Sequence, residues 1–133
     1  MPRYGRRSKA RLAGAHTDLQ KVFNKVIKIY DCSIMVSHRG EIRQTDMFVS
    51  GRSQLKWPKS KHNSTPSRAV DAVPYPIDWA DRDKAKARFY YMAGIVKAVA
   101  HDLKVRIRWG GDWDSDMDFD DQTFDDLPHF ELR

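Results

Sequence analysis

Two histidines and an aspartate, far apart in the chain, are the residue types of a hydrolytic metal site. His62, Asp71 and His129 supply two imidazoles and one carboxylate. A catalytic Zn²⁺ uses such a ligand set, with water in the fourth position. Zinc bound in this way lowers the pKa of its water toward about 7 and polarises a substrate carbonyl. Asp126, three residues before His129, stands where a general base for that water could act. Convergence of these four side chains would make the protein a metal-dependent hydrolase.

Asp71 carries the strongest single signal because its neighbours are apolar. The segment AVDAV, residues 69–73, reads as a strand, and aspartate is depleted in strands. A carboxylate held among apolar side chains needs a partner, and a cation is a natural one. The remaining histidines compete for a role. His16 and His101 lie at predicted helix ends, whereas His38 follows a predicted strand and could line a substrate pocket.

The elements that must position these groups are those of a small α+β protein. Apolar residues at 3–4 spacing indicate helices, and short apolar runs indicate strands. The sequence predicts helices over residues 17–30, 41–50 and 82–102, and strands over 33–37, 69–73, 105–109 and 129–132. A long loop covers residues 52–68, and an acidic loop covers residues 110–126. This order predicts a small, mainly antiparallel sheet with helices packed on one face and the metal site on the sheet.

Composition points to one soluble domain. The 133 residues, 41% hydrophobic and 32% charged, predict a single globular unit over residues 1–133 with a basic N-terminal arm over 1–14. We take a monomer as the default. The single cysteine, Cys32, excludes an intrachain disulfide and a cysteine-based zinc site. No apolar run approaches the roughly 20 residues that cross a bilayer. No apolar region follows the basic N-terminus, so we expect no signal peptide.

Charge is unevenly distributed. Residues 1–111 carry 23 Lys and Arg against 9 Asp and Glu, whereas residues 112–133 carry 1 against 9. A body this basic is drawn to polyanions, which include nucleic acid, anionic lipid and anionic cell-wall polymers. A nucleic-acid-binding module, with Trp57, Trp79 and Tyr75 stacking on bases, is therefore an alternative function. It leaves Asp71 unexplained, and no standard nucleic-acid motif is present, so we expect no nucleic-acid partner.

The acidic loop offers a possible second cation site. Oxygen ligands at this density suit a hard cation such as Ca²⁺. The candidate ligands are Asp112, Asp114, Asp116, Asp118, Asp120 and Asp121. The spacing differs from an EF-hand, because the sixth and twelfth positions counted from Asp112 are Met117 and Thr123. The alternative is a solvated acidic loop that offsets the basic body.

The combined motifs resemble those of a known family, the zinc D-alanyl-D-alanine carboxypeptidases and dipeptidases, with their hedgehog-like fold. Two longer segments are closer to one branch, the phage endolysins that act as L-alanyl-D-glutamate peptidases. The family motifs are Ser60-x-His62, Ala69-x-Asp71 and Asp126-x-x-His129-x-Glu131, and the branch segments are Trp57-Pro58-x-Ser60-Lys61-His62 and Pro66-Ser67-Arg68-Ala69-Val70-Asp71.

The resemblance implies a role for each matching residue. His62, Asp71 and His129 would bind zinc, and Asp126 would be the catalytic carboxylate. The family's Ser-x-x-Arg-x-x-x-x-Gln segment matches Arg39 and Gln44. A cation at Arg39 fits the need to stabilise a developing oxyanion. Together with Ser60 and His38, Gln44 is expected to contact substrate.

The implied function is hydrolysis of an amide bond in the stem peptide of bacterial peptidoglycan, L-Ala–D-Glu, during host cell lysis. Such an enzyme waits in the host cytoplasm and reaches the wall when lysis begins. A D-alanyl-D-alanine carboxypeptidase of the same family is the alternative, although such enzymes work outside the cell and need export. A third hypothesis is an inactive protein that the metal only stabilises. It does not explain Asp126, because a structural metal site needs no general base.

Overall fold

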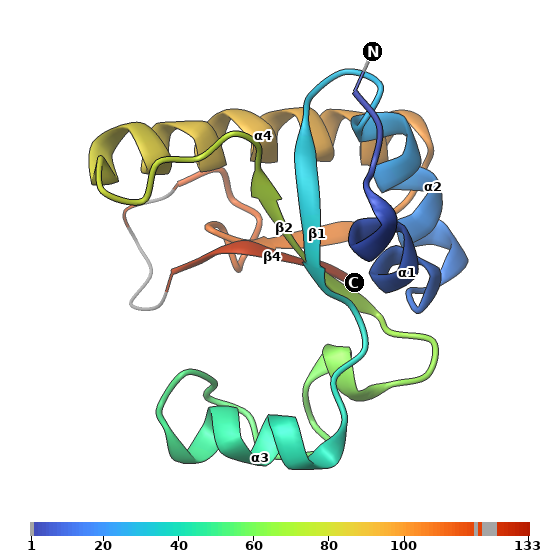
Figure 1. Ribbon diagram of the computed structural model, residues 1–133, viewed down its shortest axis with the longest axis vertical. Helices are drawn as coiled ribbons and strands as arrows, with labels where there is room; N and C mark the ends of the chain where they lie inside the picture. The colour runs from blue at the N-terminus through green and yellow to red at the C-terminus, as the bar shows by residue number, and fades with distance from the viewer. Residues whose placement is uncertain (1, 119, 121–124) are drawn as a thin grey trace.

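A four-stranded antiparallel sheet forms the centre of the computed structural model, which describes residues 2–118, 120 and 125–133. Over these residues the strand order is β1-β2-β4-β3, and every neighbouring pair is antiparallel. Figure 1 shows the arrangement. The elements, in chain order, are α1 (Arg6–Ala13), α2 (Thr17–Val26), β1 (Cys32–Val36), α3 (Glu41–Val49), the 3₁₀ turn η1 (Lys61–Asn63), β2 (Ala69–Pro74), α4 (Arg82–Asp102), β3 (Ile107–Gly110) and β4 (Asp126–Leu132).

Strand alternation gives the sheet one apolar and one polar face. Side chains of successive strand residues point to opposite faces. On β2, Val70 and Ala72 join the buried core, and Asp71 between them faces the other way. On β4, Phe130 belongs to the core, and His129 lies on the same face as Asp71. Alternation therefore puts the polar residues of both central strands on one surface.

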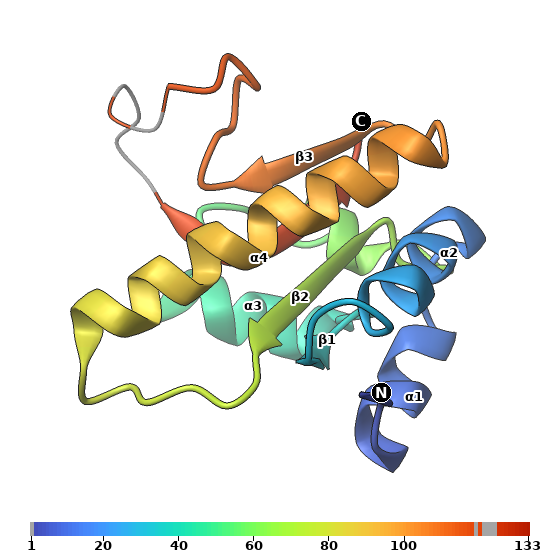
Figure 2. The same ribbon diagram turned by 90° about the horizontal axis from the view of Figure 1, so that it is seen from above.

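Helices α2 and α4 cover the apolar face (Figure 2). The inward residues recur at 3–4 spacing, which is the pattern of one buried helix face. Phe23 of α2 meets Phe130 of β4 edge to face, with ring centroids 5.7 Å apart. The other inward residues are Leu19, Val22 and Val26 of α2, and Phe89, Met92, Val96 and Val99 of α4. The α+β prediction, with helices on one face of a small antiparallel sheet, is confirmed.

The N-terminal segment forms a helix that the sequence analysis did not predict. Helix α1 packs on β1, where the Ser8 hydroxyl accepts a hydrogen bond from Ile34 N at 3.0 Å. Arg11 Nη1 donates to the carbonyl of the same residue at 3.1 Å. Leu12 and Tyr4 complete the buried side of the segment. Side chains of the helix thus hydrogen-bond backbone groups of β1, an edge strand that would otherwise be open to pairing with another strand.

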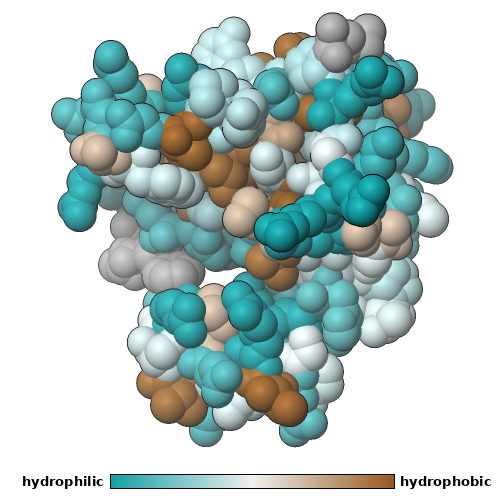
Figure 3. All heavy atoms as spheres, viewed as in Figure 1, coloured by the Kyte–Doolittle hydropathy of each residue, from teal (hydrophilic) through white to brown (hydrophobic). Residues whose placement is uncertain are grey.

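Helix α3 stands apart from the sheet, in the lower lobe of Figures 1 and 3. Gln44 is its one buried residue, whereas Ile42 and Val49 are 82% and 78% exposed. A polar side chain rather than an apolar face therefore anchors this helix. Figure 3 shows the molecule hollowed between this lobe and the body that carries the sheet.

Two predicted boundaries were wrong in ways that matter for the site. Strand β4 begins at Asp126 rather than His129, so Asp126 lies in the sheet opposite Gly110. A Cβ on Gly110 would lie 1.9 Å from the Asp126 carbonyl oxygen, so the close approach requires glycine here. The predicted long loop contains the turn η1, which carries His62. No helix in the described part of the chain is long and apolar enough to span a membrane.

Candidate metal centre and catalytic cleft

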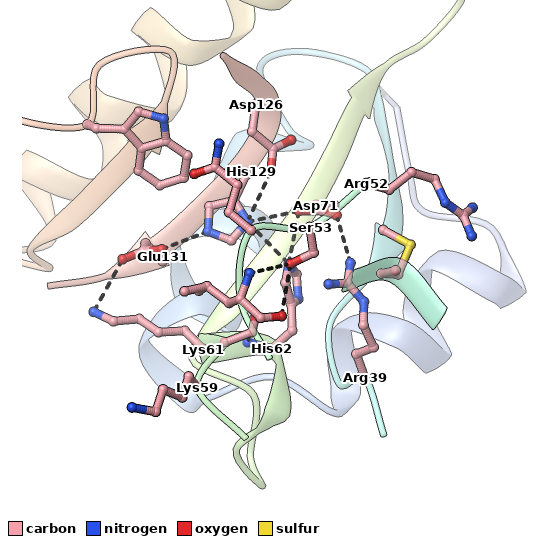
Figure 4. Close-up of a pocket in the computed structure, with 15 residues that line it drawn as sticks. Arg39, Arg52, Ser53, Lys59, Lys61, His62, Asp71, Asp126, His129 and Glu131 are labelled. Carbon is pink, nitrogen blue, oxygen red and sulfur yellow. Dashed lines mark hydrogen bonds and ion pairs between the residues drawn. The ribbon is translucent and has the colours of Figure 1, made fainter. Parts of the chain in front are cut away.

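Three side chains from three separate elements meet on the polar face of the sheet. His62 comes from η1, Asp71 from β2 and His129 from β4, and the last two are direct partners across the ladder. His62 Nε2 lies 3.1 Å from Asp71 Oδ1 and 3.2 Å from His129 Nδ1. His129 Nδ1 lies 3.2 Å from Asp71 Oδ1. Figure 4 shows the three groups pointing toward one another.

The spacing of these donor atoms fits a small tetrahedral cation. Ligands bound to Zn²⁺ at about 2.0–2.1 Å in tetrahedral geometry lie roughly 3.3 Å from one another. The three observed separations are 3.1, 3.2 and 3.2 Å. All three atoms belong to a group that could hold one metal ion. The arrangement therefore matches three corners of a tetrahedron and leaves the fourth corner toward the cleft.

One ring nitrogen of each histidine donates a hydrogen bond away from the centre, and this bond fixes which nitrogen faces the centre. His62 Nδ1 donates to the Ser37 carbonyl at 2.7 Å, since a carbonyl oxygen can only accept. His129 Nε2 donates to Glu131 Oε1 at 2.8 Å. Each histidine thus presents its other nitrogen, Nε2 of His62 and Nδ1 of His129, to the centre. Outer partners of this kind orient metal-binding histidines.

Glu131 is held as a carboxylate by cations on its far side. Lys61 Nζ lies 3.4 Å and Arg108 Nη1 3.7 Å from Glu131 Oε2. Burial raises the pKa of Glu131, but the hydrogen bond from His129 and the charge of Lys61 outweigh it, and the pKa lies below its usual value. The acceptor for His129 therefore stays ionised at neutral pH.

The metal-free centre holds a proton on His129. Burial disfavours the charged ring, but hydrogen bonds to Asp71 and Glu131 raise the pKa of His129 to about 9. Burial also raises the pKa of Asp71, yet hydrogen bonds from His129 and His62 dominate and hold that pKa well below its usual range. At neutral pH the pair is therefore an imidazolium beside a carboxylate.

Metal binding must displace this proton, because a metal ion binds only the unprotonated Nδ1. We expect at least about one proton to be released per Zn²⁺ bound at pH 7, because His129 must lose its proton. Calorimetric titrations in two buffers of different ionisation enthalpy measure this number directly. Heats that do not depend on the buffer at pH 7 would contradict the assignment.

Asp126 stands beside the centre without belonging to it. Asp126 Oδ2 lies 3.8 Å from His129 Nδ1, and its side chain is 35% exposed. Burial and the charge of Asp71 raise its pKa above the ordinary value. A carboxylate with a raised pKa, within reach of the open corner, suits transfer of a proton from water to a leaving group.

Arg39 approaches the centre from the other side and is 7% exposed. Its Nη2 lies 3.8 Å from Asp71 Oδ2, and its Nη1 donates to Gln44 Oε1 at 3.0 Å. Its Nε is buried and has no hydrogen-bond partner among the described residues. Burial lowers the pKa of Arg39, and the charges of Asp71 and Asp126 oppose the shift. The cleft thus contains a cation in a fixed position, and its Nε–H donor makes no hydrogen bond to a described residue.

The centre lies at the floor of a cleft of about 590 Å³ between the sheet and the α3 lobe. Met47, Ser53 and Leu55 of the lobe form one wall, and Lys59 and Lys61 stand near η1. A cleft of this size accommodates a short peptide. Metal ligands, a carboxylate outside the ligand set and a buried cation together suit hydrolysis of an amide.

Comparison with known proteins decides the family. The family model described as phage L-alanyl-D-glutamate peptidase matches residues 1–133. The chain belongs to this family. The L-alanyl-D-glutamate peptidase of Escherichia phage T5 is 29% identical over 126 residues, covering 90% of this chain and 88% of that protein. The crystal structure of the Serratia marcescens L-Ala D-Glu endopeptidase ChiX superimposes with a TM-score of 0.75 at 27% identity, covering 99% of this chain and 91% of that one. The predicted resemblance is confirmed, and the chain is a peptidase.

The peptidase places two expected substrate contacts away from the cleft. Gln44 is fully buried behind Arg39, and its side-chain amide donates to Ser53 Oγ and to the Leu55 carbonyl at 3.0 and 2.7 Å. His38 is exposed and is not among the residues that line the cleft. The structure thus does not bring Gln44 and His38 to the cleft, and substrate contact by either residue stays a prediction. Ser60 does line the cleft, where its hydroxyl also caps η1.

We therefore expect Gln44 to position Arg39 and to stabilise the folded protein. We expect Gln44→Met to lower the free energy of unfolding by about 1–3 kcal/mol, because buried partners of the amide are left unsatisfied. It should also lower kcat, since Arg39 loses the acceptor that fixes its guanidinium. Thr45→Met, at the exposed neighbouring position, is the matched control. Urea unfolding and kcat measured side by side check both parts, and an unchanged midpoint and kcat would refute the role.

Sequence reasoning assigned no role to Glu131 or to the Ser37 carbonyl. The motif Asp126-x-x-His129-x-Glu131 contains Glu131, and period-two alternation puts residues 129 and 131 on one face. That signal could have revealed the contact. The Ser37 carbonyl is a backbone group, for which no residue type gives a signal. Trp113, whose ring lies 5.4 Å from that of His129, was missed for lack of any motif.

Proposed function

We propose that the protein is a zinc-dependent phage endolysin that hydrolyses the L-Ala–D-Glu bond of the peptidoglycan stem peptide during host cell lysis. The observation that best supports this proposal is the triangle of donor atoms of His62, Asp71 and His129, with Asp126 outside it. The names of both relatives support the choice of bond. We further propose that residues 1–133 act as one monomeric domain, held in the host cytoplasm until lysis.

Each residue of the cleft has a part in the proposed reaction. Zinc held by His62, Asp71 and His129 would supply a Lewis acid and a water of lowered pKa. Asp126 accepts the proton of the attacking water and later delivers it to the nitrogen of the leaving amine. Arg39 directs its guanidinium at the oxygen that becomes negative as the carbonyl turns tetrahedral.

Fragment analysis of purified peptidoglycan tests the proposal. Mass spectrometry should find new amino-terminal D-glutamate and new carboxyl-terminal L-alanine, and a chelator should abolish both. Released free D-alanine instead would identify a D-alanyl-D-alanine carboxypeptidase, the alternative of the same family. Cleavage that persists after complete removal of metal would overturn the zinc mechanism.

We also propose that the acidic loop binds Ca²⁺, with Asp112 as its central ligand. Asp112 is fully buried, and its Oδ2 meets Lys97 Nζ at 3.4 Å and Met117 N at 3.0 Å. Its Oδ1 is buried without a hydrogen-bond partner among the described residues. One carboxylate oxygen from each of Asp112, Asp114 and Asp116 lies within 4.8 Å of the other two. A buried carboxylate oxygen that lacks a donor is a ligand atom for a hard cation.

Two of the remaining predicted calcium ligands, Asp118 and Asp120, lie among the described residues and do not belong to this group of three. Asp121 lies outside the described residues. The proposed site is therefore Asp112, Asp114 and Asp116.

Calcium should stabilise the protein through Asp112. We expect millimolar Ca²⁺ to raise the melting temperature, and Asp112→Asn to remove most of that rise. Asp118→Asn, in the same loop but outside the proposed triad, is the control. Thermal melts with and without calcium measure the effect. A melting temperature that calcium leaves unchanged would eliminate the site.

A further inference from the structure

Beyond Glu131, the metal-bearing face of the sheet continues into a row of basic side chains. Arg108 of β3 pairs with Glu131 of β4 across the ladder. The next residues on the same face are Arg106 and Arg133, where Arg133 N donates to the Arg106 carbonyl at 3.0 Å. Lys61 contacts Glu131 from η1. We call Lys59, Lys61, Arg106, Arg108 and Arg133 the basic tract.

The basic tract has more positive charge than its surroundings neutralise. Glu131 pairs with Lys61 and Arg108 and also accepts from His129. Arg106 and Arg133 are exposed and take part in none of the ion pairs formed between described residues. The basic tract thus faces solvent next to the cleft, and the side chains of Arg106 and Arg133 are in no ion pair between described residues.

The tract begins at the metal ligands and runs away from them. At roughly 3.3 Å per strand residue, Arg133 lies about 13 Å along β4 from His129, the length of about four extended peptide residues. Lys59 and Lys61 line the cleft, and Figure 4 shows them on the Glu131 side of the metal ligands. A peptide bound in the cleft can therefore continue along the tract.

The substrate has the matching charge on one side of its scissile bond. This step rests on the proposed function. A glutamate acylated on its nitrogen by alanine has two carboxyl groups, and the chain can continue through only one of them. The other stays free as a carboxylate on the leaving-amine side. Alanine, on the other side of the bond, contributes no charge.

We propose that the basic tract binds the carboxylates of the peptide segment that begins with D-glutamate. The tract is then a specificity site that sets the direction of the substrate. The D-glutamate carboxylate, one residue from the scissile bond, lies near Lys61 and Arg108. Carboxylates farther along the segment lie over Arg106 and Arg133. Its contribution is electrostatic and exposed, so each contact is worth only a modest factor in affinity.

Steady-state kinetics of the zinc-loaded enzyme on two soluble peptides test this proposal. One peptide carries free carboxylates after the scissile bond, and the other has the same carboxylates amidated. For Arg106→Gln/Arg133→Gln we expect a roughly two- to ten-fold rise in KM for the acidic peptide, with kcat within about two-fold and no change in KM for the amidated one. Arg106→Lys/Arg133→Lys should restore KM, because charge is retained. Arg6→Gln/Lys9→Gln, on α1, is the matched control and should leave both KM values unchanged.

A second readout is independent of turnover. NMR titration of the metal-free protein with the acidic cleavage product, which begins with D-glutamate, should shift the Arg106 and Arg133 signals and weaken in the double glutamine variant. An unchanged KM for the acidic peptide, or equal rises for both peptides, would overturn the tract as a carboxylate site. If the wild-type enzyme cleaves neither peptide, the proposed function fails, and product binding alone then decides for or against the tract.

Discussion

Replacing Asp126 with alanine is expected to lower kcat by roughly two to four orders of magnitude while leaving the bound metal in place. Asp126 Oδ2 lies 3.8 Å from His129 Nδ1 and outside the triangle of donor atoms. Its side chain is 35% exposed, so its loss leaves no large cavity. The peptidase would lose its proton acceptor and keep all three metal ligands.

Metal content and turnover measured on one preparation check this expectation. The variant should contain one zinc ion per chain, as we expect of the wild type, and release almost no peptide. Asp102→Ala, an exposed carboxylate at the end of α4, is the control and should retain full turnover. Near-normal turnover by Asp126→Ala would show that another group is the base.

His62→Ala should abolish both metal binding and turnover. His62 is 2% exposed and supplies one of three donor atoms. Removing an outer partner of a metal ligand already costs about 10- to 100-fold in affinity, so losing a ligand should cost roughly 100-fold or more. The variant should also lose the rise in melting temperature that we expect zinc to give the wild type, because that rise reflects binding to the folded state.

Zinc analysis after dialysis and thermal melts with and without a chelator measure these two effects. His101→Ala removes an exposed histidine, 91% accessible at the end of α4, and serves as the matched control. A His62→Ala protein that keeps stoichiometric zinc, or still gains stability from it, is the outcome that excludes His62 as a ligand.

Comparing these two variants separates a role in catalysis from a role in binding the metal. Asp126 and His62 both face the cleft, yet the proposed roles predict opposite effects on metal content. A purely structural metal site would give normal folding and no turnover in the wild type. A shared role as ligands would make both variants lose metal.

Sequence reasoning located the candidate centre because strand alternation is a strong constraint. Asp71 interrupts an apolar strand, and only a partner on the far face of the sheet could accommodate it. The sequence analysis did not predict that Asp71 pairs directly with His129 across the β2–β4 ladder, which brings the two side chains together. Fold class followed from the same periodicities.

The features of the fold and the site that were not predicted depend on tertiary contacts that residue types do not specify. Helix α1 was missed because five of its eight residues are polar or charged and its buried residues are Ser8 and Leu12, which form no apolar stripe. Gln44 was assigned a substrate contact from the resemblance of its segment to Ser-x-x-Arg-x-x-x-x-Gln, and that motif does not reveal that α3 packs through a polar side chain. The early start of β4 at Asp126 follows from pairing with Gly110, a tertiary contact.

X-ray absorption at the zinc edge of the loaded enzyme tests the central claim most directly. The account predicts one zinc ion per chain with four nitrogen or oxygen neighbours at about 2.0–2.1 Å, two of them imidazoles, and no sulfur. In His62→Ala the imidazole contribution should disappear together with the metal. A sulfur neighbour, six oxygen neighbours or fewer than two imidazoles in the wild type would contradict the centre formed by His62, Asp71 and His129.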